Sequence, residues 1–151
     1  MTDVELTRAH ERGEIANASF HHLSHLHVAW VYLSESWSVD EAAAKMRTTL
    51  QRFAASVGHP EKYHETITLF WVHLLAALRA VEPRRTLEQI MQANPQLLEK
   101  DFPLAYYSPE QLFSDKARSS WIKPDLKPLL VDATALRSSS SPGYTPDWTL
   151  S

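Results

Sequence analysis

The most distinctive stretch of the sequence is Phe20-His21-His22-Leu23-Ser24-His25-Leu26-His27-Val28-Ala29-Trp30-Val31-Tyr32-Leu33. It places four of the eight histidines within seven residues and continues directly into an apolar, aromatic segment. Apolar side chains recur there at helical spacing, which predicts a core helix over about residues 18–34. The predicted inward positions are Phe20, Leu23, Leu26, Ala29, Trp30 and Leu33. Histidines on a core helix indicate a metal-binding or acid/base site, but they identify no substrate.

The composition is that of a globular protein, and it excludes several classes of chemistry. The chain has 151 residues, of which 44% are hydrophobic and 22% charged, with a net charge of -3. This length is sufficient for one domain with a substantial core. Since the charges are mixed in sign, we expect neither nucleic-acid nor membrane partners. Because there is no cysteine, disulfides, thiolate metal ligands and cysteine catalysis are excluded.

The N-terminal residues do not resemble a secretory signal. Met1-Thr2-Asp3-Val4-Glu5 is acidic and lacks an apolar core. The longest apolar run, residues 69–78, is interrupted by His73 and is too short to span a bilayer. We therefore expect a cytoplasmic protein.

Capping signals predict a second and a third main helix. Ser38-Val39-Asp40-Glu41 is a capping box, in which the serine hydroxyl and the glutamate carboxylate each accept from a free amide. That helix should end near Val57, because Gly58 suits the left-handed position that follows a helix. Pro60 suits the first position of the third helix, which we expect to run to about Val81.

The rest of the chain predicts shorter helices and an extended end. Thr86-Leu87-Glu88-Gln89 is another capping box, and its helix should end before Asn94-Pro95. We find no strand pattern and no repeat. The sequence therefore predicts an all-α fold, a compact helical bundle of about four main helices with an extended C-terminal wrap. Residues 1–131 should form a single helical domain, and residues 132–151, which are serine-rich, a flexible tail. Further short helices are expected near residues 5–12, 95–98, 108–111 and 114–117.

The first and third main helices both carry histidines, and these histidines would form a metal site if the two helices face each other. His22 and His25 lie three residues apart, so both can point to one side of their helix. His64 lies on the same stripe of the third helix as Trp71 and should face the core. We therefore predict a pocket between the first and third main helices in which His22, His25 and His64 bind a divalent metal ion. An ion held by three imidazoles with an open position can activate water.

Other side chains can support this site or replace its chemistry. Tyr32 and Thr68 are candidate cofactor-binding residues, and His64 paired with Glu65 is a candidate catalytic acid/base unit that needs no metal. The pocket can instead take a small acidic ligand. The alternative is a non-catalytic helical interaction or ligand-binding module, possibly a homodimer, whose five tryptophans and five tyrosines line a contact surface. Whether the protein is an enzyme stays open.

Arg118 is the third feature that carries possible chemistry. It is the only arginine between Arg85 and Arg137, in a segment rich in aromatic and capping residues. Its guanidinium can bind a carboxylate or phosphate of a ligand. The alternative is a structural salt bridge to Asp115 or Asp125 that fastens the C-terminal part of the chain.

Three stretches resemble a family of small uncharacterised bacterial proteins. They are Phe20-His21-His22-x-x-His25 with Ala29-Trp30-x-Tyr32-Leu33, then Lys62-Tyr63-His64-Glu65-Thr66-Ile67-Thr68, and the Tyr-Ser-Pro…Ala-Arg…Pro-Asp pattern over residues 107–125. The similarity covers roughly residues 13–130. The resemblance implies that motif positions are occupied by His22, His25, His64, Glu65, Thr68, Ser114 and Arg118. It implies no reaction, because that family has no assigned function.

Overall fold

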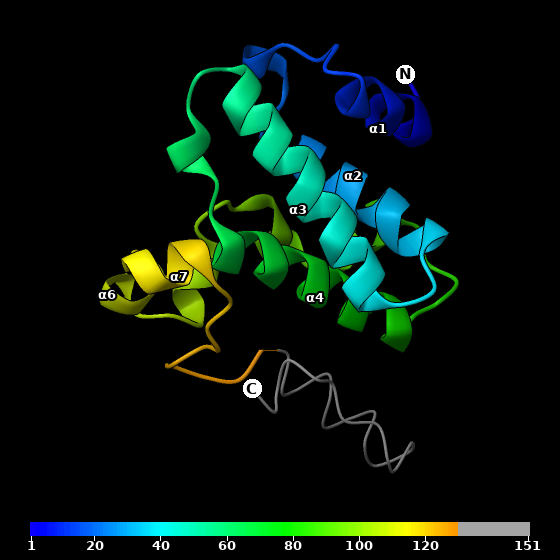
Figure 1. The fold of residues 1–151 in the computed structure, drawn as a ribbon. Helices are drawn as coiled ribbons and strands as arrows, with labels where there is room; N and C mark the ends of the chain where they lie inside the picture. The colour runs from blue at the N-terminus through cyan, green and yellow to red at the C-terminus, as the bar shows by residue number, and fades with distance from the viewer. Residues whose placement is uncertain (130–151) are drawn as a thin grey trace.

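The computed structural model describes residues 1–129, and the regular structure in this part of the chain is entirely helical. It contains seven α-helices and four 3-10 helices, and no strand occurs within these residues (Figure 1). The predicted all-α class is therefore confirmed. The predicted flexible tail, residues 132–151, lies outside the described residues.

The first helix, α1 (Asp3–Glu11), packs against the histidine-bearing helix. Thr2 begins it with a capping box, in which the Thr2 hydroxyl accepts from the Glu5 amide and the Glu5 carboxylate accepts from the Thr2 amide. The chain turns away at Gly13, whose φ of 72° lies in the left-handed region that favours glycine. The short helix expected near residues 5–12 is therefore present and begins slightly earlier.

The predicted first main helix is divided in two. A 3-10 turn, η1 (Asn17–Ser19), precedes Phe20, which has extended φ and ψ of -113° and 92°. The helix proper, α2, spans His22–Glu35. Phe20 is nevertheless buried, whereas Leu23 is 38% exposed. The inward placement of Leu23 was wrong, because Phe20 reaches the core from outside the helix and does not share its face.

The second main helix, α3 (Val39–Ser56), begins and ends where the sequence predicted. The Ser38 hydroxyl accepts from the Glu41 amide at 3.1 Å. The Glu41 carboxylate, however, accepts from the amide of Trp37 and not from that of Ser38. Gly58 follows the helix with a φ of 81°.

The third main helix starts five residues later than predicted. Pro60–Lys62 forms a separate 3-10 turn, η2, and α4 spans Glu65–Val81. Tyr63 and His64 between them have extended backbones, and the His64 ring caps α4. A side chain can only cap a helix from a non-helical residue, so the cap excludes His64 and its predecessors from α4.

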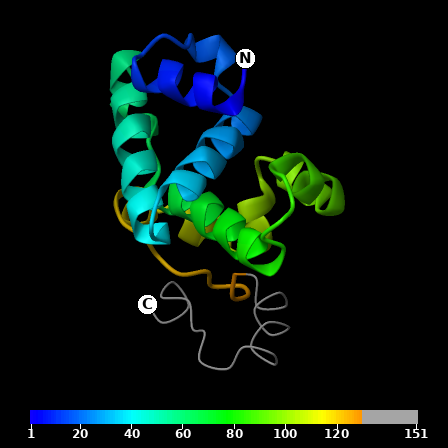
Figure 2. The ribbon, with the colours of Figure 1, turned by 90° about the vertical axis from the view of Figure 1, so that its right-hand side faces the viewer.

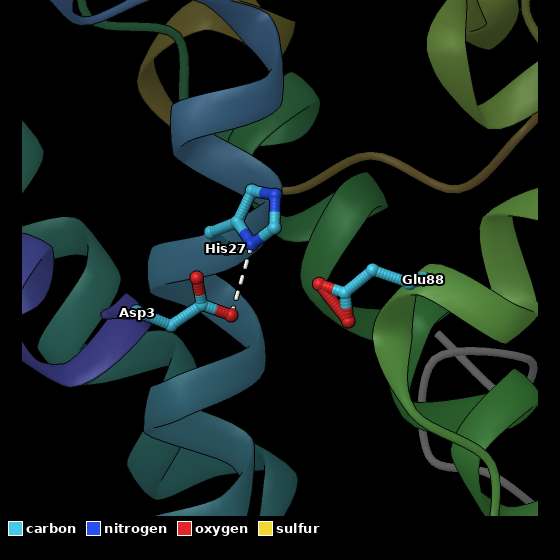
Figure 3. A group of neighbouring side chains, drawn as sticks. All are labelled: Asp3, His27 and Glu88. Carbon is cyan, nitrogen blue, oxygen red and sulfur yellow. Dashed lines mark ion pairs between the residues drawn. The ribbon is translucent and has the colours of Figure 1, made fainter. Parts of the chain in front are cut away.

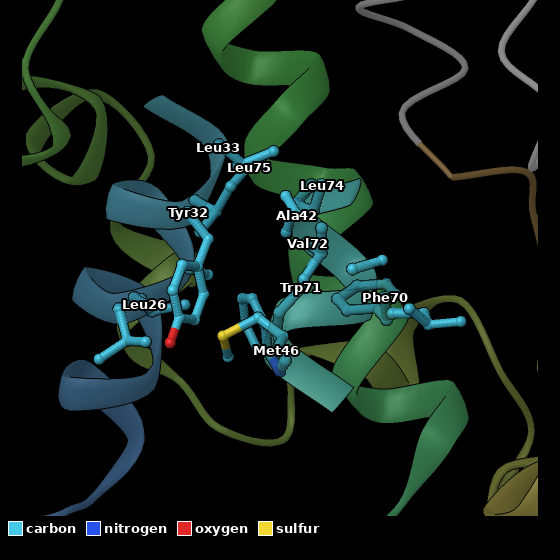
Figure 4. Close-up of a cluster of buried hydrophobic side chains, with 14 of the residues drawn as sticks. Leu26, Tyr32, Leu33, Ala42, Met46, Phe70, Trp71, Val72, Leu74 and Leu75 are labelled. Carbon is cyan, nitrogen blue, oxygen red and sulfur yellow. The ribbon is translucent and has the colours of Figure 1, made fainter. Parts of the chain in front are cut away.

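Helix α4 is the centre of the core. It crosses beneath α2 and α3 (Figures 1 and 2), and it also contacts α7 from the second half of the chain. Side chains of α2, α3 and α4 interdigitate between these helices (Figure 4). The fully buried α4 residues include Phe70, Val72, Leu74 and Leu75. Burying such side chains stabilises the fold by about 1.5–3 kcal/mol each.

The second half of the described chain consists of short helical turns. They are α5 (Leu87–Ala93), η3 (Pro95–Leu98), η4 (Phe102–Ala105), α6 (Pro109–Leu112) and α7 (Asp115–Ser119). Residues 121–129 contain no helix. The Tyr107 hydroxyl donates to the Ile122 carbonyl at 2.7 Å, and the Leu126 amide donates to the Tyr106 carbonyl at 2.9 Å. Within residues 1–129, no helix has the length and apolar character needed to cross a membrane.

Candidate functional site

A partly open cleft of about 390 Å³ lies between α2, α3 and the start of α4. All three predicted histidines, His22, His25 and His64, line it, and so does Thr68. The cleft thus brings these four residues around one space. The cleft has apolar walls formed by Phe20, Met46, Leu50, Phe53, Ala54, Val57, Ile67 and Trp71.

The charged residues that line this cleft are both lysines. Lys62 approaches it from η2 and Lys100 from the chain after η3, and no aspartate or glutamate lines it. Within residues 1–129, neither lysine forms an ion pair with a carboxylate. The cleft lining therefore offers two ammonium groups and no carboxylate, although Glu61 and Glu99 adjoin these lysines in the chain.

His64 uses both ring nitrogens to hold the structure. Its Nδ1 accepts from the Ile67 amide at 3.1 Å, which caps α4. Its Nε2 lies 2.7 Å from the Leu112 carbonyl. Because a carbonyl can only accept, Nε2 carries the proton and donates. Burial lowers the pKa of His64, which favours this neutral tautomer.

His22 is tied to the second half of the chain in a similar way. Its Nε2 donates to the Leu97 carbonyl at 2.8 Å, and its ring packs against Trp71 with centroids 4.7 Å apart. Burial lowers the pKa of His22 as well. The ring thus carries no charge at neutral pH and one nitrogen is already bound.

His25 is the cleft histidine whose nitrogens make no hydrogen bond within residues 1–129. Its ring packs against Phe20, with centroids 4.5 Å apart. Burial lowers the pKa of His25 to about 4, and nearby His10 adds to this effect. A neutral imidazole offers one donor and one acceptor, so His25 can hydrogen-bond a molecule in the cleft.

The structure does not bring the three histidines together as a metal-ligand set. Within residues 1–129, one nitrogen from each of His22, His25 and His64 cannot be chosen so that all lie within 4.8 Å of one another. Ligands of one ion must come closer, since metal–nitrogen bonds are about 2.0–2.1 Å. The carbonyls of Leu97 and Leu112 hold two of the rings in other directions.

Glu65 does not line the cleft and is held by two partners. The Arg47 guanidinium of α3 donates to both carboxylate oxygens, with nitrogen–oxygen distances of 2.6 to 3.0 Å. The Tyr63 hydroxyl donates to Oε1 at 2.6 Å. Glu65 is 9% exposed. The predicted His64–Glu65 acid/base pair is not formed here, because each side chain is bonded elsewhere.

Tyr32 also lies outside the cleft. Its hydroxyl donates to Glu11 Oε2 of α1 at 2.6 Å, and its ring is 1% exposed. Arg8 joins the same network by bonding Glu11 and Glu35. The predicted cofactor-binding tyrosine therefore fastens α1 to α2.

Arg118 lies against η2 and forms neither predicted salt bridge. Its guanidinium donates to the Glu61 carbonyl at 3.1 Å. No ion pair with Asp115 or Asp125 occurs within residues 1–129, and Asp125 instead accepts from the Ser108 amide at 2.8 Å. The predicted structural salt bridge was therefore wrong, and Arg118 of α7 instead binds the backbone carbonyl of Glu61 in η2.

The sequence did not predict Lys62 and Lys100 as residues of the site. Lys62 lies two residues before His64, so its position in the motif was available as a signal. Lys100 lies 36 residues after His64 and has no pattern that marks it, because only the packing of the second half of the chain brings it to the cleft.

Comparison of the chain with known proteins identified no family. No protein-family model matches the chain, and no curated protein and no solved structure matches it either.

Proposed function

We propose that the protein binds a small organic acid with an apolar body in the cleft between α2, α3 and α4. The observation that carries this proposal is the charge pattern of the lining: Lys62 and Lys100 without a carboxylate, at the rim of apolar walls. A cleft lined by one sign of charge raises the local concentration of ligands of the opposite sign.

The apolar walls favour a compact hydrophobic body for this acid. Sites for small molecules usually enclose about 300–1,000 Å³, and the cleft of about 390 Å³ is at the small end of that range. Phe20, Phe53 and Trp71 present ring faces or edges to the space. A flat aromatic or branched aliphatic group can cover these surfaces and exclude water from them.

The histidines contribute shape and one point of hydrogen bonding. His22 and His64 are held by carbonyls of Leu97 and Leu112, so they form rigid, uncharged parts of the wall. His25 retains a free nitrogen and can donate to a ligand oxygen. An acid bound in this way is held by the two lysines at its carboxylate and by the rings at its body.

The test compares an acid with its neutral amide. We expect 4-phenylbutyrate, with about 12 non-hydrogen atoms at roughly 0.3 kcal/mol each, to bind with a Kd of about 2 mM. 4-Phenylbutyramide should bind about fivefold or more weakly, since two lysine contacts of up to about 1 kcal/mol are lost. Two-dimensional NMR of the labelled chain measures both affinities and shows whether the resonances of Phe20, His25 and Trp71 move.

Single lysine variants localise the effect. Lys62→Gln and Lys100→Gln should each reduce the preference for the acid, whereas Lys116→Gln, which removes an exposed lysine of α7 away from the cleft, should leave it unchanged. Equal binding of acid and amide, or acid binding that moves no cleft resonance at about 10 mM ligand, contradicts the proposal.

A further inference from the structure

A second group of polar side chains lies on the other side of α2 from the cleft. Asp3 of α1, His27 of α2 and Glu88 of α5 come from three separate helices, and one ligating atom of each lies within 4.8 Å of the other two. Figure 3 shows the two carboxylates and the imidazole turned toward one another. Asp3 Oδ2 lies 2.9 Å from His27 Nδ1.

Neither carboxylate of this group pairs with a lysine or an arginine within residues 1–129. Within residues 1–129, Glu88 forms no ion pair, and Asp3 pairs only with His27. Two carboxylates at this separation repel each other unless a positive charge lies between them. A cation bound between the two carboxylates would offset this repulsion.

The imidazole offers a nitrogen that no hydrogen bond uses. His27 Nδ1 is shielded from solvent, and it makes no hydrogen bond within residues 1–129 although Asp3 Oδ2 is close. The oxygen therefore lies off the direction of a ring N–H. When Nδ1 carries no proton, its lone pair lies beside two carboxylates, which together form a donor set that Zn²⁺ and related ions take.

We propose that Asp3, His27 and Glu88 form a binding site for a divalent transition-metal ion such as Zn²⁺. Bonds of about 2.0–2.2 Å from one ion to these atoms place neighbouring ligands about 3 to 3.5 Å apart, close to the separation of Asp3 and His27. Glu88 is exposed, so its side chain can move inward to complete the set. The ion would join α1 and α5 to α2.

To test this proposal, Zn²⁺ is titrated into the full chain, without an affinity tag, in the presence of a chromophoric chelator that competes with the protein for the ion. We expect one equivalent to bind and the melting temperature to rise with added Zn²⁺, because an ion bound only by the folded state stabilises it. Asp3→Asn, His27→Gln and Glu88→Gln should each weaken binding by about tenfold or more. Co²⁺ should give a d–d absorption spectrum that these variants lose.

The matched control is the other pairing of a histidine with a carboxylate. His59 Nδ1 and Glu61 Oε1 lie 3.1 Å apart on the surface, without a third ligand. Glu61→Gln should leave Zn²⁺ binding unchanged. The proposal is overturned if the wild type binds no stoichiometric Zn²⁺, if Glu61→Gln loses as much affinity as Glu88→Gln, or if NMR shows only a protonated His27 paired with Asp3. These results are independent of acid binding in the cleft.

Discussion

The His64 ring forms two hydrogen bonds that serve different parts of the structure. Through Nδ1 it caps α4, and through Nε2 it holds the carbonyl of Leu112 at the end of α6. Asparagine can supply the capping oxygen from the same position but is too short to keep both bonds. His64 could therefore bind a ligand or act in catalysis only by giving up one of these two hydrogen bonds.

Substitution of His64 separates these two contacts. We expect His64→Ala to lower the free energy of unfolding by about 2–3 kcal/mol, the sum of a lost cap and an unpaired buried carbonyl. His64→Asn should restore about 1 kcal/mol of that loss by recovering the cap. Urea denaturation followed by circular dichroism measures both. If the two variants were equally unstable, the cap would contribute nothing.

The carboxylate of Glu65 is the counter-charge of the Arg47 guanidinium. Glu65→Gln keeps the size of the side chain but leaves the Arg47 guanidinium without its counter-charge, so we expect a loss of about 1–3 kcal/mol. A double-mutant cycle with Arg47→Met gives the coupling between the two groups. Coupling near zero in urea denaturation would show that the pair does not stabilise the contact between α3 and α4.

At the level of elements, polar bonds join α1 to α2 in addition to its contacts with the core. The hydroxyl of Tyr32 reaches Glu11 near the end of α1, and Arg8 connects Glu11 with Glu35 at the end of α2. The buried residues of α1 itself are few: Thr7, Ala9 and His10. The docking of this helix should therefore depend in part on the tyrosine hydroxyl.

Tyr32→Phe tests this dependence, since it removes only the hydroxyl. We expect the amides of α1 to exchange with solvent about fivefold faster, corresponding to about 1 kcal/mol, while those of α4 change little. Tyr63→Phe, which removes a hydroxyl bonded to Glu65, is the matched control and should not affect α1. Hydrogen exchange by NMR distinguishes them, and uniform acceleration in both variants would contradict a local role.

At the level of the whole molecule, burial keeps several imidazoles neutral. It lowers the pKa of His10, His22, His25 and His64, and that of His25 to about 4. His10 is 4% exposed and lies between Phe20 and Phe53, with neither ring nitrogen hydrogen-bonded within residues 1–129. In the unfolded chain the same rings titrate near their ordinary pKa, about 6.5.

Stability should therefore decrease in acid. Below about pH 6.5 the unfolded chain binds protons that the folded chain does not, so the free energy of unfolding falls as the pH falls toward the folded-state values. His25 alone should account for roughly 3 kcal/mol between pH 7 and pH 4. Urea denaturation at a series of pH values measures this slope. His25→Asn should flatten it, whereas His59→Asn, at an exposed site, should not.

Much of the fold could be predicted because its signals are local. The capping residues Thr86 and Ser114 lie beside the helices they begin, and Gly58 follows the helix it ends. The apolar spacing of residues 65–81 likewise reports only on that segment. The start of α4 was misplaced because Pro60 is compatible with both a 3-10 turn and an α-helix, and the choice depends on the cap formed by His64.

The sequence by itself determined that the chain is helical, since periodicity and caps act within a few residues. That His64 shares a cleft with His22 and His25 depends on how the helices pack. Only the tertiary structure decided what these rings do. The carbonyls of Leu97 and Leu112 lie 75 and 48 residues from the histidines that they bind. Because a ring N–H donates to whichever carbonyl the packed chain presents, His22 and His64 became parts of the wall. His25 kept its free nitrogen, and the charge of the cleft came from Lys62 and Lys100.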